Sequence, residues 1–368
     1  MIDSDVFLKK IKVYPRIIID LSKIEGNARK VYYMCFENDK DLMAVTSEVS
    51  SNPIIVESIL NAGIHNIGDS RIEDLLNLEK EQKNDLNLTL IRPPSISRID
   101  TSLEHIDRIY VSDLTTVKIL EKMANLYRLV YNIVIVLDIG DGRDGVTKEE
   151  LPFFIREILN MKSIKIVGIS VNYSCISGIL PTEKDQEELD NTIEKISGEI
   201  DVSSIVISAG GTVVLKLLKE KKLSKKIKEI RCGEGILLGT STSENKTISW
   251  LEKNTFILEA EIIEVREKRC EPIGELGVDS CGNIPKFLSK GIRKRAVVAL
   301  GYKDVDISTI KPIDPQIYIL AASNDYLILD VTDAIPNYNS GEVVQFSLQS
   351  SSLSRAMSSP YISKVYKK

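Results

Sequence analysis

Short runs of apolar and β-branched residues alternate with amphipathic stretches between residue 40 and about residue 240. Stretches such as 70–83 and 115–127 repeat their apolar residues every three or four positions, which predicts helices. Strands that alternate with helices predict a parallel sheet. The eight predicted strands are 42–45, 66–68, 88–91, 108–111, 132–137, 165–171, 204–208 and 228–231.

Eight such units are the number that a closed barrel requires, so the pattern favours an α/β fold with a (β/α)8 TIM-type barrel. An open, doubly wound sheet is the alternative. It is less favoured because no GxGxxG motif follows an early strand. The strand predicted at 16–20 does not fit among the eight and is a candidate to pair with a second domain instead.

The pattern changes after residue 245, where strands follow one another with little helix between them. Turns rich in glycine and proline, such as 271–277 and 339–342, separate these strands. We therefore predict two domains, a barrel over 1–245 and a smaller all-β C-terminal domain over 246–368. The strands predicted in the second domain are 255–267, 293–300, 316–322, 325–331 and 342–348.

Composition narrows the function classes. The 48 basic and 53 acidic residues give a net charge of −5, so we expect no nucleic-acid partner. We find no signal-peptide pattern at the start and no apolar run of membrane-spanning length, and we expect a cytoplasmic protein with no membrane partner. Five scattered cysteines without a CxxC pair and only two histidines (His65 and His105) predict reduced thiols and no metal site.

Ligands of such barrels bind at the carboxyl ends of the strands, and the loops after strands seven and eight often hold a phosphate. Here those loops are SAGGT (208–212) and RCGEG (231–235). Glycines let backbone N–H groups approach an anion, a helix start adds partial positive charge, and Ser208 and Thr212 offer hydroxyl donors. The alternative is that both are ordinary tight turns of a barrel.

Polar residues follow the other strands too, and for about half of them salt bridges at the barrel rim are an equally good interpretation. The acidic stretch 138–145 lacks the terminal glutamate of a calcium-binding EF-hand loop, so we discount that interpretation. The polar residues that follow these other strands are Asp69, Ser70, Arg71, Glu73, Arg92, Asp138, Asp141, Arg143, Asp144, Asn172, Tyr173 and Cys175.

Motifs along almost the whole chain carry a family resemblance. They are YPRIIIDLSKIEGNAR, LMAVTSEVSSNP, GIHNIGDSRIEDL, LDIGDGRDGV, RCGEGILLG, LEAEIIEVREK, PIGELGVDSCGN, GIRKRAVVALG and RAMSSPY. The sequence resembles the ornithine/alanine racemase family of fold-type III pyridoxal-phosphate enzymes, which are isomerases. The resemblance implies a barrel followed by a β-domain and a head-to-tail homodimer with active sites at the subunit interface.

Three parts of the family's cofactor site map onto this sequence. In the family an AVTK motif on the first barrel strand supplies the lysine that binds the cofactor covalently, and here Ser47 stands in its place. The arginine of the RxGE motif, which contacts the pyridine nitrogen, corresponds to Arg231, with Gly233 following. The family's phosphate loop SGGNSS corresponds to 208–213, where Ser208 and Gly210 match, Gly211 differs and Thr212 is a conservative replacement.

Further residues are assigned on weaker grounds. Tyr302 lies in a GYKD setting that is similar to that of the family's catalytic tyrosine, although a packed tyrosine at the rim is an equally good interpretation. We also expect Arg71, Arg143 and Asn172 to contact the substrate, because they follow barrel strands.

Ser47 changes the chemistry that the resemblance implies. A serine hydroxyl cannot form an imine with the cofactor, and without an activating partner it is not a base at neutral pH. Glu48 is adjacent, but on a strand it would point to the opposite face. We therefore expect pyridoxal phosphate, if it binds, to be held non-covalently.

Three functions remain open, and the sequence does not decide whether the chain is an enzyme. The first is a degenerate homologue, or pseudoenzyme, that binds an amino acid, pyridoxal phosphate or their adduct. It would act as a binding or accessory protein in ornithine- or lysine-type metabolism, for example as the partner of a pyridoxal-phosphate aminomutase. The second is an active racemase, or another enzyme, that uses a different lysine such as Lys303. The third is a purely structural or regulatory barrel.

Overall fold

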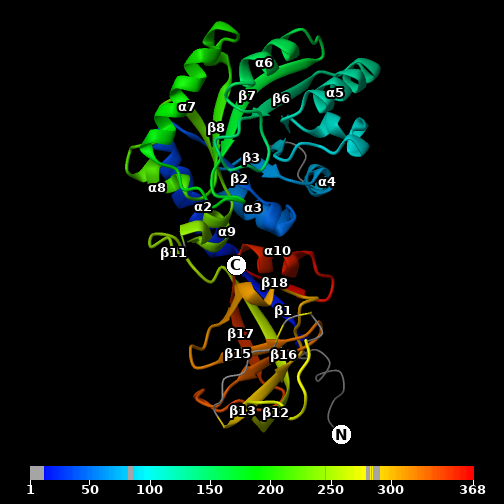
Figure 1. Ribbon diagram of the computed structural model, residues 1–368, viewed down its shortest axis with the longest axis vertical. Helices are drawn as coiled ribbons and strands as arrows, with labels where there is room; N and C mark the ends of the chain where they lie inside the picture. Colours follow the sequence, from blue (N-terminus) through cyan, green and yellow to red (C-terminus); the bar gives the residue numbers. More distant parts are fainter. Residues whose placement is uncertain (1–11, 82–85, 245, 279–281, 283, 285–290) are drawn as a thin grey trace. The chain divides into compact units, whose positions relative to one another are not determined.

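The computed structural model describes residues 12–81, 86–244, 246–278, 282, 284 and 291–368, so Cys281 and part of the PIGELGVDSCGN motif lie outside the described residues. The chain forms two compact units (Figure 1). One consists of Ser22–Lys253. The other joins the segment that ends at Leu21 to Asn254–Lys368.

Eight parallel strands close into a barrel in which every strand pairs with its neighbours in sequence and β2 pairs with β9. The predicted fold class and all eight predicted strands are thereby confirmed, and the open sheet is excluded. The strands are β2 (Asp41–Val45), β3 (Asn66–Asp69), β4 (Asn87–Leu90), β5 (Arg108–Val111), β6 (Tyr131–Val136), β7 (Ile164–Asn172), β8 (Val206–Gly210) and β9 (Ile227–Cys232).

The barrel strands contain near-continuous buried runs, because a parallel strand covered by helices is buried on both faces. In β5 and β6 the residues Tyr110, Val134 and Val136 are at most 3% exposed and form one apolar cluster. Ile91 and Val167 pack against this cluster.

α-Helices lie between most successive strands and surround the barrel, while the connection from β4 to β5 contains two 3-10 helices (Figure 1). Local capping explains several of their starts. The Asp113 side chain accepts a bond from the Thr116 amide at 2.8 Å, and Thr182 and Asp185 form a capping box. In the described part of the chain, no helix has the length and apolar character needed to cross a membrane. The helices are α2 (Leu21–Phe36), α3 (Pro53–Asn61), α4 (Ile72–Glu81), α5 (Leu114–Tyr127), α6 (Leu151–Leu159), α7 (Glu183–Lys195), α8 (Val214–Lys219) and α9 (Glu234–Leu238).

The second unit is built around one long strand, β12, whose two halves have different neighbours. Its first half pairs with β1 and β17, and its second half pairs with β13 after a register shift between Ile262 and Glu264. β1 also pairs in parallel with β18. The elements of this unit are β1 (Arg16–Asp20), β12 (Phe256–Arg269), β13 (Ile292–Val298), β14 (Ile310–Pro312), β15 (Tyr318–Ala322), β16 (Leu327–Asp330), β17 (Val343–Leu348), α10 (Ser350–Ser358) and β18 (Ser363–Lys367).

Candidate functional site

Ser47 follows the first barrel strand but does not lie on it. β2 ends at Val45, and Ser47 begins a 3-10 helix, η1 (Ser47–Val49), so the prediction that Glu48 points to the other face of a strand is wrong. Ser50 and Ser51 then adopt left-handed backbone conformations, with φ of 49° and 44°. For residues other than glycine this conformation is uncommon and needs support from neighbouring groups.

That support comes from a buried aspartate at the end of β3. The Ser51 hydroxyl donates to Oδ2 of Asp69 at 2.6 Å and lies 2.8 Å from the Thr46 hydroxyl. The other carboxylate oxygen accepts a bond from the Arg71 amide at 3.0 Å. Asp69 therefore ties the turn that contains Ser47 to the segment that follows β3. Burial raises the pKa of Asp69 to about 6, although these hydrogen bonds favour its charged form.

The raised pKa of Asp69 predicts a stability that falls with increasing pH. Between about pH 4 and pH 6 the folded chain retains a proton that the unfolded chain has released, so the free energy of unfolding should fall by about 3 kcal/mol across this window. We expect the free energy of unfolding of an Asp69→Asn variant to lack this fall between about pH 4 and pH 6. Urea titrations monitored by the fluorescence of Trp250, the chain's only tryptophan, would measure it. Parallel pH profiles for the two proteins would contradict the prediction.

Arg231 lies at the carboxyl end of β9 with its guanidinium group inside the barrel. It is 4% exposed, and it donates to the Ser208 hydroxyl at 2.9 Å and to the Val171 carbonyl at 2.9 Å. Its guanidinium carbon is 5.4 Å from the centroid of the Tyr110 ring. The two hydrogen bonds use two of the five guanidinium N–H groups.

A buried carboxylate that sequence reasoning missed completes this network. Glu229 is 2% exposed, accepts a bond from the Ser208 hydroxyl at 2.6 Å and pairs with Arg108 at 2.8 Å. Arg108 in turn donates to the Thr89 hydroxyl at 3.1 Å. Ser208 belongs to β8 rather than to the loop after it, and its hydroxyl contacts Glu229 and Arg231. Its predicted position in the phosphate loop is therefore corrected.

The two glycine-containing loops are tied to each other and to their neighbours. The Thr212 hydroxyl accepts a bond from the Gly235 amide at 3.0 Å, and the Gly211 amide donates to the Arg231 carbonyl at 3.2 Å. A side chain at Gly210 would meet Nη2 of Arg231 at 2.2 Å, so this glycine makes room for the arginine. Gly233 is similarly close to Val45, since a Cβ at position 233 would lie 3.0 Å from the backbone carbonyl oxygen of Val45.

The loops after β6 and β7 are cross-linked by hydrogen bonds, and two predicted substrate contacts lie there. Arg143 pairs with Asp144 at 2.6 Å and donates to Sγ of Cys175 at 3.3 Å. Asp141 accepts a bond from the Ser177 hydroxyl at 2.8 Å. Asn172 ends β7, and its Oδ1 would lie 2.7 Å from a Cβ at Gly210. Arg143 is thus held at the rim, while Asn172 lies beside the Arg231 network.

Two other candidates occupy separate places. Arg71 lines a cavity formed by residues that follow β3 and β4, with no residue of β8 or β9 in its lining. Tyr302 belongs to the second unit, where its amide donates to the Ser323 carbonyl at 3.0 Å. The neighbouring Lys303 is exposed and pairs with Asp325 at 2.9 Å, which raises its pKa. A lysine that attacks a carbonyl requires a lowered pKa, so this environment does not suit Lys303 to that role.

These residues can be tested against pyridoxal phosphate by their donor chemistry. Beyond its two hydrogen bonds Arg231 has further N–H groups, and the Thr212 hydroxyl, which accepts from the Gly235 amide, has a proton to donate. Ser47 provides a hydroxyl, and a hydroxyl cannot form the imine through which an amine bonds the cofactor. The site therefore fits reversible binding of the cofactor and does not fit covalent binding through residue 47.

Comparison with known proteins agrees with this architecture. Residues 19–240 match the family described as alanine racemase, N-terminal domain. The chain is 36% identical to lysine racemase of Thermotoga maritima over 96% of this chain and 99% of the relative. It is 33% identical to ornithine racemase of Acetoanaerobium sticklandii over 96% of this chain and 99% of the relative.

Solved structures show the same fold. Alanine racemase from Bartonella henselae, determined with covalently bound pyridoxal phosphate, matches with a TM-score of 0.73 and 15% identity over 97% of this chain and 100% of that chain. D-threonine aldolase from Filomicrobium marinum matches with a TM-score of 0.70 and 12% identity over 94% of this chain and 89% of that chain. The fold is therefore shared by proteins named for different reactions. Together with the sequence relatives, these matches show that the chain belongs to the fold-type III pyridoxal-phosphate racemase family.

Proposed function

We propose that this chain is a racemase homologue that binds its ligand reversibly and does not racemise through a lysine-bound cofactor. The main observation behind this proposal is that Ser47 begins η1, while Arg231 in the same barrel stays buried and hydrogen-bonded. When bound, pyridoxal phosphate withdraws electrons from the Cα of an attached amino acid. Arg231 would orient the ring, and the Thr212 hydroxyl would donate to the phosphate.

Ser47 has no amine with which to bond the cofactor or to take a proton from Cα. A neutral hydroxyl is a poor base, and losing both roles of a lysine should lower the rate by several orders of magnitude. The proposed ligand is a basic amino acid, free pyridoxal phosphate or their adduct. The relatives named lysine racemase and ornithine racemase support a basic side chain. We further propose a homodimer that serves as a binding or accessory protein in the metabolism of such amino acids.

One experiment separates this proposal from its two alternatives. The purified protein is mixed with pyridoxal phosphate, treated with borohydride and digested for mass spectrometry. We expect saturable binding by equilibrium dialysis and no single lysine that carries a stoichiometric pyridoxyl group after reduction. Stoichiometric labelling of one lysine would contradict the proposal and support an active enzyme that uses another lysine. No binding of pyridoxal phosphate, L-ornithine or L-lysine would contradict it in favour of a structural barrel.

A further inference from the structure

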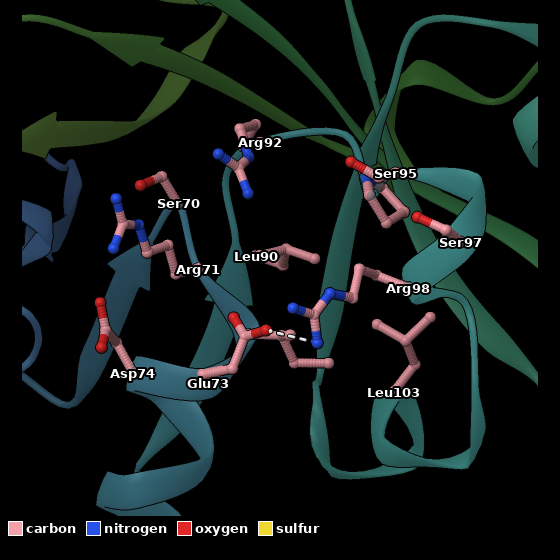
Figure 2. Close-up of a pocket in the computed structure, with 12 residues that line it drawn as sticks. Ser70, Arg71, Glu73, Asp74, Leu90, Arg92, Ser95, Ser97, Arg98 and Leu103 are labelled. Carbon is pink, nitrogen blue, oxygen red and sulfur yellow. Dashed lines mark ion pairs between the residues drawn. The ribbon is translucent and has the colours of Figure 1, made fainter.

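A cavity of about 500 Å³ opens beside the barrel strands β3 and β4, and the proposed function does not use it. It lies between the start of α4, the segment after β4 and the 3-10 helix η2 (Ile96–Arg98) (Figure 2). Its volume falls in the range of small-molecule sites, which is about 300–1,000 Å³. No residue of β2, β8 or β9 lines it, so its lining does not include the Arg231 network, and Asp69 connects it to the turn that contains Ser47.

Three arginines from three different segments line this cavity. Arg98 on η2 pairs with Glu73 at 3.1 Å, which neutralises both charges. Arg71 precedes α4 and Arg92 follows β4, and in the described part of the chain neither forms an ion pair within 4.0 Å. Figure 2 shows the Arg71 and Arg92 side chains at the same cavity as the Arg98–Glu73 pair. Two guanidinium groups therefore remain available to a ligand.

The remaining lining determines what such a ligand would be. Asp74 contributes one acidic group, and burial raises its pKa while Arg71 opposes that shift. The cavity consequently carries a net positive charge. Ser70, Ser95 and Ser97 add hydroxyl groups, and the Ser95 side chain makes no capping bond to η2.

The apolar part of the lining is fixed by the core. Ile72, Leu90 and Leu103 are at most 8% exposed, so this wall is held by packing and does not need a ligand to form. The backbone of Arg71 is also held, because its amide donates to Asp69 at 3.0 Å. A preformed wall and a fixed backbone lower the entropy cost of binding.

We propose that this cavity is a second ligand site, which binds a small metabolite through a carboxylate or phosphate group held by Arg71 and Arg92. The planar, multiply donating guanidinium group suits both oxyanions, and serine hydroxyls provide further donors. The volume is sufficient for an occupant of amino-acid size. The site is independent of the residue at position 47 and of whether the barrel mouth binds pyridoxal phosphate.

Isothermal titration calorimetry at low ionic strength tests the proposal with three probes, namely inorganic phosphate, succinate and L-ornithine. We expect saturable binding of at least one probe, and the identity of the probe distinguishes a phosphate ligand from a carboxylate ligand. Arg71→Gln and Arg92→Gln should each weaken that binding by about ten-fold or more, since each removes hydrogen bonds from a charged donor. Arg156→Gln is the matched control, because Arg156 is an exposed arginine of α6 paired with Glu199.

Two results would overturn the proposal of a second ligand site. One is the absence of saturable binding by all three probes. The other is binding that the Arg71 and Arg92 variants leave within two-fold of the wild type, or that Arg156→Gln weakens equally. Circular dichroism would verify that the variants are folded. Pyridoxal-phosphate binding is measured separately in the Arg71→Gln/Arg92→Gln double variant, and its retention there would show that failure of one site does not imply failure of the other.

Discussion

A Ser47→Lys variant mixed with pyridoxal phosphate is expected to acquire a visible absorption band that the wild-type protein lacks. On the proposed function, the new amine would supply the group that bonds the cofactor, while Arg231 at the end of β9 and Thr212 after β8 would contact its ring and phosphate. After borohydride reduction, mass spectrometry should find roughly one pyridoxyl group per chain, attached to residue 47. The change is from no covalent adduct to nearly complete labelling.

Ser50→Lys is the matched control for this variant. Ser50 is a half-buried serine of the same turn, three residues further along the chain, and its backbone is left-handed. A lysine there should remain unlabelled if position 47 alone is aimed at the cofactor. A colourless Ser47→Lys protein that is folded would show that the surrounding residues no longer hold pyridoxal phosphate, and the proposed function would then be wrong.

Replacing Glu229 with alanine should lower the free energy of unfolding by about 3–5 kcal/mol. The substitution leaves the guanidinium group of Arg108 without its partner at 2.8 Å and removes the acceptor of the Ser208 hydroxyl. Breaking a buried pair by removing one partner is costly, because the remaining charge stays desolvated. Arg231, which depends on Ser208 for one of its two hydrogen bonds, should also lose its fixed position.

The measurement is urea unfolding followed by Trp250 fluorescence, which reports on the unit formed by Ser22–Lys253. Glu194→Ala is the control, because Glu194 pairs with Lys226 at 2.6 Å but its side chain is 69% exposed. Exposed pairs contribute about 0–1 kcal/mol, so this variant should remain near the wild type. If the two variants lose similar stability, the buried network does not contribute as proposed.

The fold was largely predictable because burial on both faces leaves a clear signal in each barrel strand. The strand 132–137, for example, is almost entirely apolar, and the observed β6 covers Tyr131–Val136. In the second unit the predicted strands were found, but β14, β18 and α10 were missed. No element was predicted for the serine-rich segment Ser350–Ser358, which is helical with Leu353, Ala356 and Met357 buried.

The candidate site was less predictable, since its contacts join residues that are far apart in the sequence. Glu229 is a single acidic residue in a predicted strand, and the neighbouring sequence does not indicate that Arg108 pairs with it across the barrel. The 3-10 turn at Ser47 depends on Asp69, eighteen residues after Ser51. Glu48 was predicted to lie on a continuing strand, because the left-handed conformations of Ser50 and Ser51 carry no sequence signal.

The parallel pairing of β1 with β18 has a consequence for how the chain folds during synthesis. All eight barrel strands have been synthesised once Cys232 is made, so the barrel can fold while the ribosome still holds the rest. β1 must instead wait for β12 and for β18, whose pairing with β1 extends to Lys367. Its three isoleucines remain without the β18 partner until that strand has been synthesised, so β1 completes its pairing later than any barrel strand.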